Sequence, residues 1–172
     1  MQALTHPEEL SEVEIRQEAR FVLWALRWCA LDHQGDSEQA KAEIARGFEL
    51  ADASEAAASF WEFARCLCQC ASSSLVWHGP VCGCVSSGEM HVLHALAQVA
   101  DHERHAIAGA SPWWRVLVPA ARLEQVDALA RRWLAQLHRA GIEYPGATRL
   151  IEALGPLQNL MDEMPARRAV LN

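Results

Sequence analysis

The chain has no excess of positive charge. Its 15 lysine and arginine residues are outnumbered by 22 aspartates and glutamates, so the formal net charge is -7 at pH 7. Adjacent basic residues occur only as Arg131-Arg132 and Arg167-Arg168. Proteins that bind nucleic acid need a net basic face, because lysines and arginines displace the counterions of the phosphates. The charge balance therefore predicts that nucleic acid is not a partner.

The sequence also lacks a long apolar segment. Its best apolar run extends from Phe21 to Leu31 and is interrupted by Arg27, whereas a membrane-spanning helix needs about 20 apolar residues. Positions 1–10 carry two glutamates and no basic-then-apolar order, so we expect no signal peptide and no membrane partner. These absences predict a cytoplasmic protein. Thiols stay reduced in that compartment, so the six cysteines are expected to be free, metal-bound or redox-active.

Several catalytic motifs are missing as well. A glycine-rich phosphate loop and a Gly-x-Ser-x-Gly turn are both absent, which removes the usual support for an NTPase or a hydrolase. No Glu-x-x-His pair occurs, so the signature of a di-iron helical bundle is absent. The two histidines His102 and His105 are one residue closer than the pair of a zincin metalloprotease. An enzyme is therefore the least favoured of three predicted function classes.

The alternation of polar and apolar residues that marks strands is not found. Apolar residues instead recur at three- and four-residue spacing behind capping signals such as Ser86-x-x-Glu89, which is typical of helices. Four helices are predicted first: from Thr5 to about Asp32, from Asp36 to about Asp52, from Asp52 to about Ser74, and from Ser86 to about Ala108. A short helical turn from Trp113 to Val118 is cut by Pro119, and a long helix follows it to Gly141. The last helix starts near Thr148 and is expected to bend at Gly155-Pro156. Glycine, proline and serine mark residues 75–87 as a loop. At 19.1 kDa, residues 1–172 are expected to form a single-domain all-α bundle of six or seven helices.

Five of the six cysteines lie within nineteen positions, namely Cys66, Cys68, Cys70, Cys82 and Cys84. Thiolates are strong metal ligands and redox groups, so the cluster favours a metal or thiol site, although no pair has the two-residue gap of zinc fingers. On the expected helix Cys66 and Cys70 lie one turn apart, whereas Cys68 points away from both. All three also lie on its apolar side, so the alternative is that they are small core residues, which is the favoured explanation for Cys68.

The loop pair of Cys82 and Cys84 is more informative, because loops run over the surface and burial is a poor explanation there. Together with His78, four positions upstream, the pair supplies the sulfur and nitrogen ligands that zinc prefers. We therefore predict a metal site, zinc first, at His78, Cys82 and Cys84, with a fourth ligand from Cys66 or Cys70. The alternatives are a pair that cycles between dithiol and strained disulfide, or plain structural thiols.

The first helix is predicted to have two apolar sides. One side carries Ile15, Ala19, Val22, Leu26 and Cys29, and the other carries Phe21, Trp24, Trp28 and Leu31. We call the second set the aromatic stripe. A helix that is apolar all round must be covered all round. It is therefore either the central helix of the bundle or a helix whose aromatic stripe contacts a second copy or another protein.

Four histidines, His91, His94, His102 and His105, share one face of the fourth predicted helix with Gln98. The opposite face carries Val92, Leu96, Val99 and Ile107. We expect the histidine face to be solvated, with an interior catalytic site as the alternative. Further along, Trp113 and Trp114 cannot both face one core. At least one is expected to cover the edge of a helix or to form a protein contact.

Taken together, these patterns favour a non-enzymatic cytoplasmic accessory protein that binds zinc through the loop thiols. The second prediction is a metal-free helical interaction module or assembly chaperone. Its contact surfaces would be the aromatic stripe and the Trp113-Trp114 pair, with another protein or a second copy as the partner. An enzyme that uses the histidine face is the third.

Overall fold

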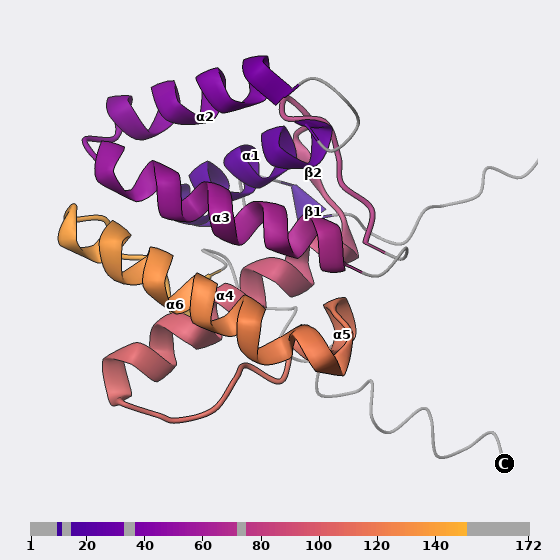
Figure 1. Cartoon of the computed structure of the whole chain (residues 1–172), viewed down its shortest axis with the longest axis vertical. Helices are drawn as coiled ribbons and strands as arrows, with labels where there is room; N and C mark the ends of the chain where they lie inside the picture. The colour runs from indigo at the N-terminus through magenta and orange to yellow at the C-terminus, as the bar shows by residue number, and fades with distance from the viewer. Residues whose placement is uncertain (1–9, 12–14, 33–36, 72–74, 151–172) are drawn as a thin grey trace, which may run out of the picture.

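Helices make up most of the described chain, as Figure 1 shows. The computed structural model describes residues 10–11, 15–32, 37–71 and 75–150. Its α-helices are α1 (Gln17–Asp32), α2 (Ser37–Leu50), α3 (Ser54–Cys70), α4 (Ser87–His105), α5 (Trp114–Leu117) and α6 (Leu123–Arg139). The remaining elements are the strands β1 (Leu10–Ser11) and β2 (Cys84–Val85) and the 3-10 turns η2 (Ala120–Arg122) and η3 (Ala147–Arg149). The predicted all-α fold is confirmed.

The helices pack as two groups of three. Helices α1, α2 and α3 contact one another in the upper half of Figure 1, and α4, α5 and α6 contact one another in the lower half. Contacts of α3 with α6, and of α1 with α4, join the two groups around one hydrophobic core. Aromatic rings run through that core from α2 to α6, with centroid distances of 5.2 Å for Phe48–Phe60 and 5.2 Å for Phe60–Trp133.

The start of α4 follows the capping signal read from the sequence. The Ser86 hydroxyl accepts a hydrogen bond from the Glu89 N–H at 3.1 Å, and the Glu89 carboxylate accepts one from the Ser86 N–H at 2.9 Å. This reciprocal pair satisfies two backbone donors that a helix start otherwise leaves unpaired. The helix ends at His105, because Ala106 adopts the left-handed conformation with φ 52°. The expected end near Ala108 is therefore wrong by one turn.

The N-terminal boundary of the first helix is a larger correction. Helix α1 begins at Gln17, and Leu10–Ser11 is an extended segment that pairs antiparallel with Cys84–Val85. A capping signal contributes only about 1 kcal/mol, so pairing with a distant segment can outweigh it. The predicted start at Thr5, the cap at Asp36, the end at Ser74 and the bend at Gly155-Pro156 lie outside the described residues. None of the described helices is long and apolar enough to cross a membrane.

Candidate functional site

Two opposite charges are buried between α1 and α4. Arg27 of α1 and Glu89 of α4 are both fully buried, with 0% exposure. Arg27 Nε donates to Glu89 Oε1 at 2.8 Å, and an Nη of the same guanidinium donates to Oε2 at 3.0 Å. This two-point geometry matches the planar fork of the guanidinium to the carboxylate. Each charge thus has the partner that burial requires.

The same pair also holds the loop of residues 75–86. The Arg27 guanidinium donates to the carbonyls of Cys82 at 2.7 Å and Cys84 at 2.5 Å. The Glu89 carboxylate accepts a hydrogen bond from the backbone N–H of His78 at 2.9 Å. At the end of the loop the Ser86 hydroxyl donates to the Val76 carbonyl at 2.7 Å. Together with the β1–β2 pairing, these bonds fix the loop backbone at several points.

The side chains of the loop are turned in different directions. His78 faces inward, with Nδ1 3.1 Å from the Cys84 carbonyl oxygen and 3.5 Å from a Glu89 carboxylate oxygen. Cys82 is half-buried and Cys84 is exposed. At the tip of the loop Val81 is 97% exposed, and Val76 is 58% exposed. The loop therefore presents apolar side chains to solvent from a backbone that is held in place.

The predicted zinc ligands are not gathered around one point. Within the ranges that the structure describes, no three histidine, cysteine, aspartate or glutamate side chains lie together so that they could hold a metal ion. Cys66 and Cys70 instead line a groove between α3 and α6. Cys66, Cys68, Cys70 and Cys82 are free thiols. The zinc site at His78, Cys82 and Cys84 stays a prediction that this geometry does not support.

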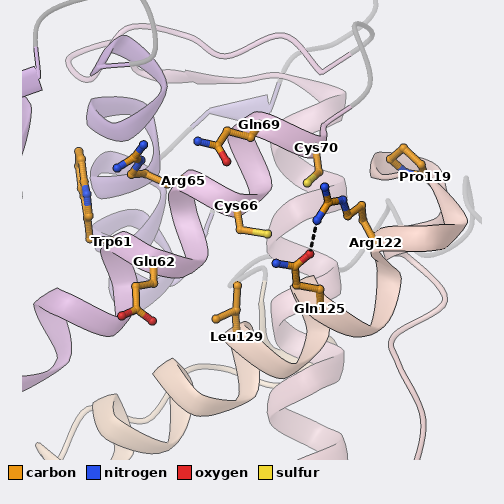
Figure 2. Close-up of a pocket in the computed structure, with 10 residues that line it drawn as sticks. All are labelled: Trp61, Glu62, Arg65, Cys66, Gln69, Cys70, Pro119, Arg122, Gln125 and Leu129. Atoms are coloured by element: carbon orange, nitrogen blue, oxygen red, sulfur yellow. Dashed lines mark hydrogen bonds between the residues drawn. The ribbon is translucent and has the colours of Figure 1, made fainter.

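The groove between α3 and α6 has a volume of about 610 Å³ and is open to solvent. Figure 2 shows the sulfur atoms of Cys66 and Cys70 on the side of α3 that faces Arg122. Burial, together with the neighbouring Cys70, raises the pKa of the Cys66 thiol to about 11, and the Arg122 guanidinium opposes that rise. Arg122 in turn donates to Gln125 at 2.6 Å.

Cys68 was expected to be a small core residue, and it is only partly buried. It lies between the other two cysteines of α3, is half-buried, and packs against the hydrophobic core. It does not line the groove that Cys66 and Cys70 share. All three cysteines of this helix thus pack against the core, and Cys66 and Cys70 also line the groove.

Two residues of the aromatic stripe of α1, Phe21 and Trp24, pack against α2. Phe21 packs edge-on against Phe48 with a centroid distance of 5.0 Å. A methyl group at Gly47 would overlap the Trp24 ring, so the lack of a side chain there lets the two helices approach closely. Trp28 and Leu31 are also half-buried. The explanation of α1 as a central helix thus gains support.

Part of the stripe still borders a groove of about 690 Å³. Phe21 and Trp24 line it together with Leu50, which is 78% exposed. This is a smaller surface than the whole stripe that the sequence suggested. Self-association through it stays a prediction.

The histidine face of α4 is only partly solvated. His91 and His94 stack on the Trp113 ring, with centroid distances of 5.5 Å and 5.4 Å. Burial, and after it the neighbouring His91, lowers the pKa of His94. His105 is exposed, with its Nδ1 2.8 Å from the carbonyl oxygen of Asp101. Ile107 was expected on the apolar face, but it is 47% exposed because the helix ends before it.

Of the two adjacent tryptophans, only Trp113 reaches the surface. Trp114 is fully buried, and its indole N–H donates to the Asp127 carboxylate at 3.0 Å. A partner could not touch Trp114 unless the core rearranged. Trp113 is half-buried and covers the edge of α4, as one of the two was expected to do.

The sequence patterns do not predict the pairing of Arg27 with Glu89. A signal was present, because Arg27 is the charge that interrupts the apolar run from Phe21 to Leu31. A charge in the middle of a helix that is apolar all round indicates a buried partner. Its spacing from Ser86 marks Glu89 as a capping residue, but its pairing with Arg27 depends on which helix lies opposite α4.

Comparison of the chain with protein-family models, curated proteins and solved structures finds no match in any of the three.

Proposed function

We propose that the chain is a non-enzymatic helical module that binds another protein through the loop of residues 75–86. The observation that carries this proposal is Val81, which is 97% exposed at the tip of a loop whose backbone is held by a fully buried ion pair. Exposed apolar side chains on a fixed backbone are suited to protein contacts. Loops placed on a rigid scaffold are also the usual location of binding residues.

The buried ion pair supports a need for a defined loop conformation. Replacing such a pair by apolar residues of similar volume is often neutral or stabilising, by about 1–4 kcal/mol. Stability alone therefore gives little reason to bury Arg27 and Glu89. Their bonds to the Cys82 carbonyl and the His78 N–H instead define where the loop lies.

A held loop also binds with less loss of entropy. Fixing the backbone of one mobile residue costs about 1–2 kcal/mol, so a flexible loop loses much of its contact energy when a partner orders it. The loop of residues 75–86 has already been ordered by folding. Contacts made by Val76 and Val81 are therefore available for affinity.

We place this module in the cytoplasm or another reducing compartment. Free thiols at Cys66, Cys68, Cys70 and Cys82 are compatible with a reducing environment, and the Cys82 side chain is partly accessible in the loop. This part of the proposal is independent of the contact surface.

The contact surface can be tested with a photo-crosslinking residue placed at position 81 or, as a control, at position 116 of the chain in cells. Val116 is 56% exposed on α5, so it is a second exposed valine outside the loop. We expect one protein to be crosslinked from position 81 and not from position 116. When the crosslinked partner is purified, the Val81→Asp variant should bind it about tenfold or more weakly than the wild type, which corresponds to about 1.4 kcal/mol. Val116→Asp should leave the affinity for this partner unchanged. Equal affinities of the wild type, Val81→Asp and Val116→Asp would overturn the proposal.

A further inference from the structure

The thiol pair in the groove between α3 and α6 is not used by the proposed loop contact. Cys66 and Cys70 are one helical turn apart, and their sulfur atoms lie on the same side of α3. The side chains are half-buried and line an open groove, so a small ion can reach them from solvent. This arrangement places two soft ligands next to each other without any change of the backbone.

We propose that Cys66 and Cys70 form a two-coordinate binding site for a monovalent soft metal ion, with Cu(I) as its representative. Thiolates select soft ions such as Cu(I). Zinc requires four ligands in a structural site. No third histidine, cysteine, aspartate or glutamate converges with this pair in the described ranges, which favours an ion that two sulfurs can satisfy.

The geometry of the helix favours a bridging ion over a disulfide bond. Side chains four residues apart on a helix have Cβ atoms about 5–6 Å apart, whereas a disulfide needs about 3.5–4.5 Å. A disulfide between Cys66 and Cys70 would therefore distort α3. An ion placed between the two sulfurs spans the longer distance that the helix imposes.

The charges around the groove fit the bound state. Binding of one M⁺ replaces the protons of both thiols, so two H⁺ are released and the bis-thiolate complex carries a net charge of -1. The guanidinium groups of Arg122 and Arg65 line the same groove. The nearby carboxylate of Glu62 is paired with Arg132. The groove therefore supplies positive charge where the complex carries its negative charge.

The test is an anaerobic titration of the reduced full-length protein with Cu(I) in competition with a chromogenic Cu(I) chelator. We expect one ion per chain. Cys66→Ser and Cys70→Ser should each weaken binding at least about 100-fold, because even changes outside the ligand shell reduce metal affinity 10–100-fold. Cys68→Ser is the matched control on the same helix, and its affinity should equal that of the wild type. The Cys82→Ser, Cys84→Ser double variant should also bind normally, so this result is independent of the loop proposal.

Alkylation of the wild-type protein gives a second readout that does not depend on the folding of a variant. Cu(I) should protect Cys66 and Cys70 from iodoacetamide and leave the rate at Cys68 unchanged, with the sites located by tandem mass spectrometry. Unchanged affinity in both single variants, or binding that is lost with Cys82 and Cys84, would overturn the proposal. Equal protection of all three cysteines of α3 would overturn it as well.

Discussion

The loop of residues 75–86 and the groove between α3 and α6 use their cysteines in opposite ways. In the loop, the backbone carbonyls of Cys82 and Cys84 accept hydrogen bonds from the buried Arg27, and the Cys84 side chain is exposed. In the groove, the backbone of Cys66 and Cys70 is part of α3, and their sulfur atoms lie on the same side of that helix. A cysteine can therefore contribute through its main chain or through its sulfur.

This difference decides which substitutions matter in each region. The anchoring of the loop should survive the loss of its sulfurs and fail when Arg27 is lost. The metal binding proposed for the groove should instead fail when its two sulfur atoms are lost, because it depends on them and not on Arg27. Each prediction below changes one region and leaves the other as the internal reference.

The largest effect is expected for Arg27→Met. Methionine fills a similar volume, but it leaves the Glu89 carboxylate buried without its main partner and removes the donors to the loop carbonyls. Breaking a buried ion pair in this way costs about 3–5 kcal/mol of the free energy of unfolding. Urea unfolding, followed by circular dichroism, measures this change.

The control for Arg27→Met is Arg115→Met, which removes an exposed arginine from α5. Surface substitutions usually change stability by no more than about 0.5 kcal/mol. If the two variants lose the same stability, the ion pair does not hold the loop, and the contrast between the regions disappears.

A smaller but distinctive effect is expected in the reactivity of Cys66. Iodoacetamide reacts with the thiolate, and burial together with Cys70 raises the pKa of Cys66 from 9.0 to about 11. Below pH 9 the thiolate fraction is thus about 100-fold lower than that of an ordinary thiol, since each pKa unit is a factor of ten. The alkylation rate should rise with pH through a midpoint near 11 in the folded protein. In urea the midpoint should return to the ordinary value.

The Cys70→Ser variant separates the two causes of this shift. The midpoint for Cys66 should fall, yet stay above 9.0, because burial is the larger cause and remains. An identical midpoint in folded and unfolded protein would show that the groove does not shelter the pair.

The smallest effect is expected when sulfur is removed from each region in turn. Cys66→Ser with Cys70→Ser replaces two half-buried side chains that pack against the core, so a loss of about 1–2 kcal/mol is expected. Cys82→Ser with Cys84→Ser keeps the carbonyls that Arg27 contacts, and should change stability by about 0.5 kcal/mol or less. Thermal unfolding of the two double variants compares them directly. A larger loss of stability in the Cys82→Ser, Cys84→Ser variant would contradict the conclusion that the loop cysteines act through their main chain.

The helical fold was accessible from the sequence because its signals are local. Apolar spacing predicted α2, α3, α4 and α6, and the capping pair of Ser86 and Glu89 marked the start of α4 within one residue. The strand at Leu10–Ser11 was missed, since its only cause is pairing with Cys84–Val85, more than seventy positions away. Local patterns contain no information about such a partner.

The candidate site was less accessible, because it is made by long-range contacts. The cluster of cysteines in the sequence suggested one site, whereas the carbonyls of Cys82 and Cys84 accept hydrogen bonds from Arg27 of α1. The pairing of Cys66 with Cys70 was predictable, as both lie on one helix at a spacing of four. The anchoring of the loop by α1 and α4 depends on how those helices pack.

Amide hydrogen exchange at His78 tests most directly whether the Arg27–Glu89 pair holds the loop. The His78 N–H donates to Glu89 at 2.9 Å, so it should exchange slowly in the wild type and in Arg115→Met. In Arg27→Met, under conditions where the rest of the protein stays folded, we predict that this protection is lost while amides within α6 keep theirs. Slow exchange of the His78 amide in Arg27→Met, equal to that in the wild type, would contradict the account.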